Sequence, residues 1–360
     1  MVSKGFLYKS ACVISVLIII YMIHKVNFLF IPLITIFNML LVPFVIAGFF
    51  YYLLRPIVYL FDRWKIGRTL SVLIIYVCIV LIIAVLIYAV WPTLQKQITD
   101  FVKNVPQLIQ SLGKQVTILQ KSSYFSAIST DSGLSAKLSE YANEGFSFVM
   151  NYTNRLFGFI SDFIVVIGTF PIILFFLLRE SEKAPKIILR IIPRSYRPDA
   201  KNAIDEIDNA LSGYISGRMI STLLLGAMTY VAFMIIGVPY ALLLSIVLAI
   251  ISFIPFVGSF LGAIPPLIVA FTQSPEMALW VIVGVFICQQ LQDNVLSPII
   301  FGKTLDIHPF TTIIILLIAA SLAGIMGMLL ALPVYMFFKI IIVHVYNLFY
   351  AEKVQEMTEQ

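Results

Sequence analysis

The chain has 360 residues, of which 61% are hydrophobic and only 12% are charged. A soluble globular protein carries about 25% charged residues, and a single core cannot hide this much apolar surface from water. The composition therefore excludes a soluble enzyme and predicts a membrane protein whose first partner is the lipid bilayer. The formal net charge of +6 does not indicate nucleic-acid binding, because the basic residues cluster between apolar runs, where they set membrane orientation.

Eight apolar runs are candidates for transmembrane helices, each of which needs about 20 residues. The first run follows Lys4 and Lys9 and has no small-residue cleavage site after it, so we expect a retained span and not a signal peptide. The sixth and eighth runs are too long for one straight helix. The predicted fold is all-α and polytopic, with about eight transmembrane helices, one of them broken or re-entrant. The runs lie approximately at residues 10–23, 28–54, 70–91, 156–178, 214–236, 240–271, 278–296 and 310–345.

Short basic loops predict the orientation. The loops that follow the second and the fourth runs are rich in Arg and Lys, so we expect both in the cytoplasm. Eight spans then place both termini in the cytoplasm as well. The domain organisation predicted in this way has three spans in residues 1–93 and an extracytoplasmic amphipathic region in residues 94–155. Spans four to eight follow in residues 156–360, with a cytoplasmic helical loop at 180–213.

The extracytoplasmic region shows a helical repeat of apolar residues. Phe101, Val105, Leu108 and Leu112 recur at steps of three and four residues, and Pro106 is expected to interrupt this helix. The region is either a lid that packs on the helix bundle or on lipid headgroups, or a gate over a pathway.

A second amphipathic helix is predicted to run from the cytoplasmic loop into the fifth span. Its apolar face contains Ile204 and Ile207, and the opposite face carries Asp205, Glu206 and Asp208. A solvated charged face is the simplest interpretation of these carboxylates.

Signatures of common enzymes are absent. The sequence contains no GxxxxGK[ST] phosphate-binding loop, no HExxH zinc motif and no GxSxG nucleophile motif. Cys12, Cys78 and Cys288 each lie inside an apolar run and show no CxxC spacing. We therefore predict no catalytic residue, no metal site and no cofactor, and a protein that is not an enzyme.

The sixth run contains several helix breakers. Pro255, Pro265 and Pro266 each remove an amide donor, while Gly258 and Gly262 add backbone freedom and a GxxxG face. Broken helices at membrane depth are tolerated only inside protein or beside water, and they recur at transporter binding sites. A solute or ion pathway at this run is one interpretation, and a proline-kinked packing helix is the alternative.

The seventh run ends in a polar cluster. Gln289, Gln290, Asp293 and Asn294 fall within six positions, and helical spacing places the first three on one face. Asp293 could bind a cation, carry a proton or pair with Arg218 of the fifth run. Alternatively, the cluster only ends the helix at the interface, and Arg218 extends to the cytoplasmic surface.

Small residues at four-residue spacing predict close helix packing. Gly213, Gly217 and Ser221 form such a series at the start of the fifth run. Gly324 and Gly327 in the eighth run are expected to serve the same purpose.

Several motifs together resemble the AI-2E family of bacterial membrane proteins. They are Asp208-x-x-Leu211-x-Gly-Tyr214-x-x-Gly217, Gly237-Val-Pro239, Phe253-Ile-Pro-Phe-Val-Gly258, Asp293-Asn-x-x-x-Pro298-x-x-x-Gly302, His308-Pro309 and Gly324-Ile-Met-Gly-Met-Leu-Leu-Ala-Leu-Pro333. The resemblance implies an eight-span fold in the inner membrane of a bacterium, a homo-oligomer that is a pentamer, and export or permeation of a small solute. Members of the family have been linked to the signal autoinducer-2, to sodium/proton exchange and to sporulation.

Three functional hypotheses follow. The first is a secondary exporter or permease of the AI-2E type, with a route along the sixth run and the polar end of the seventh. The second is a sodium/proton antiporter in which Asp293 titrates. The third is a membrane scaffold in envelope or sporulation assembly that binds partners through its external region.

Overall fold

The computed structural model describes residues 22, 25, 27–121, 168–301 and 307–348. These residues form helices and no strands, which confirms the all-α prediction. Five stretches in the described part are long and apolar enough to cross a bilayer, and two shorter apolar helices lie among them. Most of the first predicted span and residues 156–167 of the fourth lie outside the described residues. The five stretches are Met39–Arg63, Arg68–Gln115, Arg194–Ile236, Pro275–Ile300 and Pro309–Tyr346.

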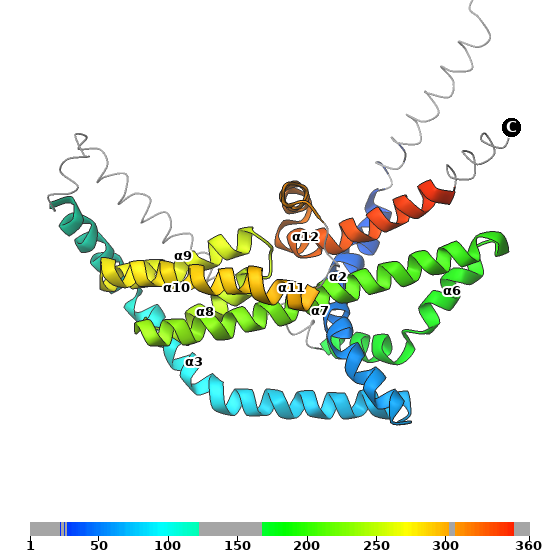
Figure 1. The fold of residues 1–360 in the computed structure, drawn as a ribbon, viewed down its shortest axis with the longest axis horizontal. Coiled ribbons are helices and arrows are strands. Elements are labelled where there is room, and N and C mark those ends of the chain that lie inside the picture. Colours follow the sequence, from blue (N-terminus) through cyan, green and yellow to red (C-terminus); the bar gives the residue numbers. More distant parts are fainter. Residues whose placement is uncertain (1–21, 23–24, 26, 122–167, 302–306, 349–360) are drawn as a thin grey trace, which may run out of the picture.

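Two long helices begin the described chain and meet at the lower right of Figure 1. Helix α2 (Asn27–Arg63) turns at its end into α3 (Arg68–Lys121), which runs through both the third span and the amphipathic segment after it. The predicted interruption at Pro106 is wrong, because α3 stays helical to Lys121. A proline removes one amide donor, and packing on neighbouring helices holds this part of α3 in place: Val105, next to the proline, is buried.

The amphipathic half of α3 packs on the bundle. The Asn104 side-chain amide donates to the Tyr240 hydroxyl at 2.9 Å, and the Gln97 side-chain oxygen accepts from the Leu243 amide at 2.9 Å. The ring of Phe101 meets the ring of Tyr240 edge to face, with centroids 5.4 Å apart. The segment of α3 around these residues therefore packs on the bundle, which both the lid and the gate interpretations allow.

The cytoplasmic loop predicted at 180–213 is helical. Residues 168–180 form a helix, and α6 (Lys183–Ile191), a short 3₁₀ turn η1 (Arg194–Tyr196) and α7 (Arg197–Ile236) follow. Helix α7 continues without a break from the amphipathic stretch into the fifth span, as predicted. It ends at Gly237, whose φ of 80° is a left-handed conformation that glycine adopts readily.

The sixth run folds as a helical hairpin. Helix α8 (Ala241–Ile251) and α9 (Val257–Gln273) pack against each other, and residues 252–256 form the turn between them. The predicted break therefore exists, and Pro255 lies in it. A second break at Pro265 and Pro266 was also predicted and is wrong, since α9 passes through both prolines. Contacts with α8 and α10 on either side hold α9 helical there.

The chain then returns through α10 (Pro275–Leu291), a π-helical turn η2 (Gln292–Leu296) and α11 (Ser297–Phe301). Helix α12 (Pro309–Tyr346) follows and is broken where Ala323 and Gly324 leave the helical conformation. This break confirms that the eighth run is not one straight helix. The turn of the α8–α9 hairpin packs on α12, because Ile254 shares a buried cluster with Leu316 and Ala331.

Candidate functional site

The α8–α9 hairpin depends on two glycines at its closest approach. A Cβ atom built on Gly258 would lie 2.0 Å from the carbonyl oxygen of Ile251, and one built on Gly262 would lie 3.0 Å from that of Leu248. Real atoms do not approach as closely as the first distance, so only glycine fits at position 258. The GxxxG face predicted from the sequence is thus the surface on which α9 meets α8.

Arg218 of α7 binds the turn of this hairpin. Its Nε donates to the carbonyl of Phe253 at 3.0 Å, and its Nη2 donates to the carbonyl of Ser252. These carbonyls follow the C-terminal end of α8, where the helix dipole favours a positive charge. Arg218 therefore does not extend to the cytoplasmic surface, which was the alternative drawn from the sequence. It joins α7 to the hairpin inside the bundle.

The polar end of α10 contacts the same two elements. The Gln289 side-chain amide donates to the carbonyl of Ser259 on α9 at 3.0 Å. The Gln292 amide donates to the hydroxyl of Ser221 on α7 at 2.8 Å, and Gln292 is only 3% exposed. Gln292 was not among the predicted site residues. Its spacing of three from Gln289 is the signal that could have identified it, because two glutamines so spaced share a helix face.

Two other polar residues at this end of the helix bond to each other. The Asn294 amide donates to the Gln290 side-chain oxygen at 2.6 Å, and both residues are exposed. Gln289 and Gln290, which were predicted to share one face with Asp293, therefore differ in their contacts: Gln289 reaches α9, whereas Gln290 bonds to Asn294. The π-helical turn that begins at Gln292 explains part of this difference, since it changes the angular spacing of the residues that follow.

Asp293 lies within electrostatic range of Arg218, and each charge acts on the other. Across the residues that the structure describes, however, no direct ion pair joins them. The predicted pairing is an interaction at longer range. Asp293 is exposed, and no group of three or more side chains among the described residues could hold a metal ion.

Two hydroxyls beside Arg218 are buried without a hydrogen-bond partner in the described part of the chain. They belong to Thr222, one turn along α7, and to Ser252, whose carbonyl binds the guanidinium. Leaving a buried polar atom unsatisfied costs free energy. Arg218, Ser221, Thr222, Ser252, Gln289 and Gln292 together form what we call the hairpin site.

The other predicted packing glycines differ in role. On α7, Gly217 is buried and Gly213 is partly buried. A Cβ atom on Gly327 would lie 2.1 Å from the Ala319 carbonyl oxygen, so this glycine permits close approach across the break in α12. Gly324 has open space around it and a φ of 58°, so its part is to form the break and not to pack.

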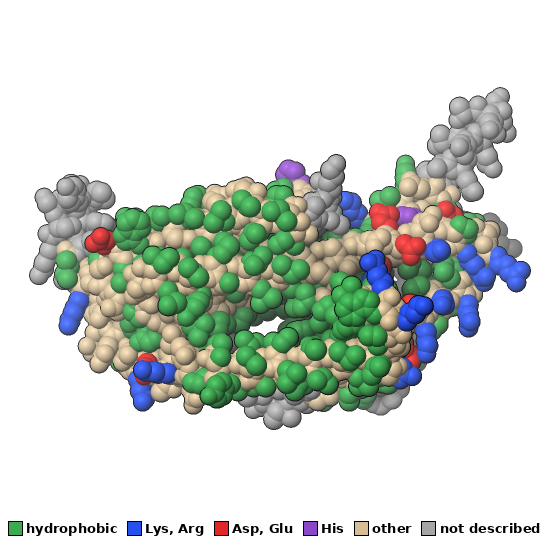
Figure 2. All heavy atoms as spheres, turned by 60° about the horizontal axis from the view of Figure 1, so that its bottom comes forward, with side chains coloured by type: hydrophobic (Ala, Val, Ile, Leu, Met, Phe, Trp, Pro, Cys, Tyr) green, Lys and Arg blue, Asp and Glu red, His purple; other side chains and the backbone are tan. Residues whose placement is uncertain are grey.

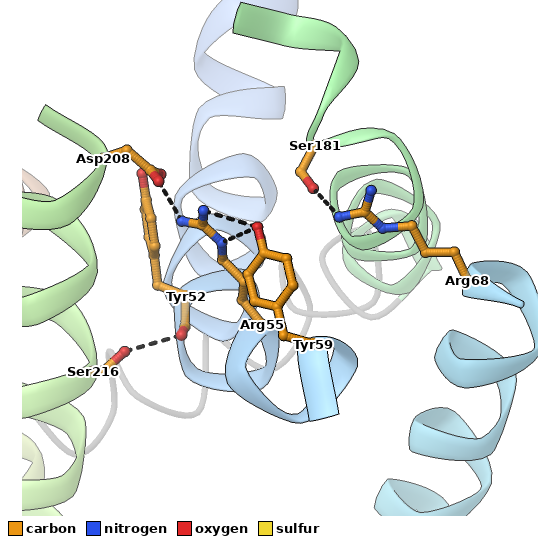
Figure 3. A network of polar contacts seen from close by, with 7 residues as sticks. All are labelled: Tyr52, Arg55, Tyr59, Arg68, Ser181, Asp208 and Ser216. Atoms are coloured by element: carbon orange, nitrogen blue, oxygen red, sulfur yellow. Dashed lines mark hydrogen bonds and ion pairs between the residues drawn. The ribbon is translucent and has the colours of Figure 1, made fainter. Parts of the chain in front are cut away.

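A second polar cluster, which we call the Arg55 cluster, lies where α2 meets α7 (Figure 3). Arg55 forms an ion pair with Asp208 at 2.6 Å, and its guanidinium also donates to the Tyr59 hydroxyl. Tyr52 stands beside Asp208, and its carbonyl accepts from the Ser216 hydroxyl at 3.0 Å. The cluster fixes α2 to the N-terminal half of α7.

Sequence reasoning did not find this cluster. It assigned Arg55 to membrane orientation and Asp208 to a solvated face, whereas the two side chains are partly buried against each other. Glu206 of the same face lies 3.6 Å from His344 of α12. The charged face of α7 is therefore partly used to contact α2 and α12, and Asp205 is exposed as predicted.

We expect Asp208→Asn to lower the stability of the folded protein by about 1–3 kcal/mol, because it leaves Arg55 without its ion-pair partner. The matched control is Asp205→Asn, three residues away on the exposed side of α7. Thermal unfolding in detergent measures both. Equal melting temperatures for the two variants would show that the ion pair contributes nothing.

Replacing Gln292 by Leu should cost about 0.5–2 kcal/mol, since interhelical hydrogen bonds in membranes are of this size and the Ser221 hydroxyl would lose its partner. Gln290→Leu is the control, because Gln290 is exposed on the same turn. The readout is again thermal unfolding, with the prediction that only Gln292→Leu shifts the transition. A larger shift for Gln290→Leu would refute the assignment of the buried contact.

Residues 10–347 match the model of the AI-2E family transporter, which covers nearly the whole chain. The chain belongs to this family. The resemblance stated from the motifs is thereby confirmed.

Individual relatives agree with this assignment. "Putative transport protein YueF" of Bacillus subtilis is 37% identical over 328 residues, which cover 90% of this chain and 89% of the relative. "Putative transport protein YrrI" of the same organism is 29% identical over 347 residues, or 94% and 95% of the two chains. The "AI-2 transport protein TqsA" of Escherichia coli is 24% identical over 305 residues, or 84% and 85%.

The family and the apolar helices together support a multi-pass bacterial membrane protein with a role in transport. At the hairpin site, two discontinuous helices meet the half-buried guanidinium of Arg218 and two hydroxyls that have no partner among the described residues.

Proposed function

We propose that the protein is a secondary transporter that exports a small polar solute through the hairpin site. The observation that carries the proposal is the position of Arg218, which binds the turn of a helical hairpin from within the bundle. Discontinuous helices provide free carbonyls and amides at transporter sites. Here the turn, Gln289 of α10, Gln292 of η2 and two hydroxyls without a partner among the described residues provide donors and acceptors for a solute.

The chemistry of the site favours a solute rich in hydroxyl or carbonyl groups. Side-chain amides and hydroxyls form hydrogen bonds to neutral polar groups, and the guanidinium adds a preference for partial negative charge. Autoinducer-2 is the first solute to test, because one relative is named for its transport.

The test uses purified full-length protein in liposomes and a panel of small solutes that includes autoinducer-2. Flux is measured with and without sodium and proton gradients. The proposal requires flux above that of protein-free liposomes for at least one solute, and loss of this flux in hairpin-site variants. Absence of flux for every solute and ion would favour the scaffold hypothesis instead.

A sodium/proton antiporter is the second candidate. The observation that favours it is the position of Asp293, a carboxylate in the π-helical turn of an apolar stretch long enough to cross a bilayer. If Asp293 carries the exchanged proton, Asp293→Asn should reduce gradient-driven flux at least tenfold, roughly the loss expected when a site loses its charge change. The measurement is flux as a function of pH and sodium.

Glu276→Gln is the control, because Glu276 lies in the first turn of α10, at the opposite end of the same membrane-length stretch. Unchanged pH and sodium dependence in Asp293→Asn would remove the antiporter and leave an exporter that is not coupled through this carboxylate.

We further propose the orientation and assembly that the sequence suggested. Both termini lie in the cytoplasm, since the basic residues of α6, η1 and the α2–α3 turn gather at one end of the molecule (Figure 2). The proposed homo-oligomer, a pentamer by family resemblance, is supported by the middle of α3. There the apolar side chains from Leu81 to Tyr88 are exposed on every side of the helix.

A further inference from the structure

Helix α6 (Lys183–Ile191) has no buried residue, although it is strongly amphipathic. It follows the helix at 168–180 and packs on α7. Such a helix normally buries its apolar face against the protein core. The apolar face of α6 is instead exposed, with Ile187 at 56%, Ile188 at 47% and Ile191 at 82%.

The helix has three distinct faces. Pro185 and Leu189, four residues apart, are its only half-buried residues and give the side that contacts α7. A second face consists of three isoleucines. Ile187 and Ile188 lie four and three residues before Ile191, and residues at this spacing share one side of a helix. The basic residues form the third face and are likewise exposed: Lys183, Lys186 and Arg190. The isoleucines therefore do not face the protein, and cations lie alongside them.

We propose that α6 lies in the surface of the membrane and binds anionic phospholipids. A helix with isoleucines on one face and Lys and Arg beside them matches the boundary between acyl chains and headgroups. The cations complement the negative charge of an anionic leaflet. Figure 2 shows that Lys and Arg side chains gather at the end of the molecule where Figure 1 places α6.

Neighbouring residues mark the same interface. Arg68 at the start of α3 binds Ser181 and Glu182, directly before α6, at 3.0 and 2.7 Å. The turn before α3 therefore lies close to the start of α6. It exposes Trp64 between Arg63 and Lys65, and tryptophan flanked by basic residues is typical of the membrane–water interface. This inference does not depend on which solute is transported.

The test uses full-length protein in which Cys12, Cys78 and Cys288 are replaced by Ser. A single cysteine at Ile191 carries an environment-sensitive fluorophore, and a second protein carries it at Lys186. Each is placed in detergent, in phosphatidylcholine liposomes and in liposomes that also contain phosphatidylglycerol. Quenching by acrylamide, a neutral aqueous quencher, reports exposure to water.

We expect quenching at position 191 to fall about threefold when phosphatidylglycerol is added, while position 186 stays accessible. Lys183→Glu together with Arg190→Glu should abolish this fall. Because α6 has no buried residues and Lys183 loses only a surface ion pair with Glu180, we expect the fold to stay intact, which size-exclusion chromatography checks.

Three outcomes would overturn the proposal. The first is a label at 191 that is as accessible in anionic liposomes as in detergent. The second is equal protection in both kinds of liposome, because anionic lipid would then not be recognised. The third is protection in detergent that rises with protein concentration, which would show that a second copy of the chain covers the isoleucines.

Discussion

Gly258→Ala is expected to reduce transport strongly, because even one methyl group at this position cannot fit. Its carbon would lie 2.0 Å from the Ile251 carbonyl oxygen and 2.7 Å from the Ser252 Cα, and both are backbone atoms that cannot rotate away. The turn at 252–256 would have to move, and with it the carbonyls that Arg218 binds. We expect flux to fall at least tenfold, roughly what displacement of a site by about 1 Å costs in positioning.

Gly48→Ala is the matched control. Gly48 also lies within a helix, and a Cβ atom there meets nothing within 4 Å. This variant should transport normally and be slightly stabilised, since alanine favours the helical conformation over glycine. Flux through Gly258→Ala liposomes at the level of Gly48→Ala would show that the hairpin turn is not part of the route.

Arg218→Gln is the second change with a large expected effect. It removes the buried charge and leaves the carbonyls of Ser252 and Phe253 without their guanidinium donor. Hydrogen bonds to charged groups contribute about 1.5–3 kcal/mol each, and about 1.4 kcal/mol corresponds to a tenfold change in an equilibrium constant. Solute flux should therefore fall more than about tenfold.

Two further variants make this result specific. Arg218→Lys keeps the charge but lacks the planar fork, so it should restore only part of the flux. Lys201→Gln removes a positive charge from an exposed position on the same helix and should leave flux unchanged. If Arg218→Gln transports as well as Lys201→Gln does, the guanidinium has no role in the route.

The sequence predicted those features that depend on local pattern. Apolar run lengths predicted helices that span a membrane, and Pro255 with Gly258 predicted the break in the sixth run. Proline alone was a poor guide, since α3 passes Pro106 and α9 passes Pro265 without a break. A proline in a helix is tolerated where neighbouring helices hold the backbone, and such support is a tertiary property.

The candidate site was only partly predictable for a similar reason. Gln289 and Arg218 were singled out because polar residues in apolar runs are costly. Their partners could not be inferred, because the carbonyls of Phe253 and Ser259 become available only when α8 and α9 fold back on each other. The Arg55–Asp208 ion pair joins residues 153 positions apart. It was not predicted, because the basic residues of this loop were assigned to membrane orientation.

The reactivity of a cysteine at Ser252 tests the route most directly. Ser252 is 1% exposed, its hydroxyl has no partner among the described residues, and its carbonyl binds Arg218. In a protein without Cys12, Cys78 and Cys288, Ser252→Cys should react with a membrane-impermeant thiol reagent in transporting liposomes, and the reaction should stop flux. Leu225→Cys, fully buried in the core of α7–α10, should remain unmodified. If Ser252→Cys stays unmodified while solute crosses at the full rate, the route does not pass through the hairpin site.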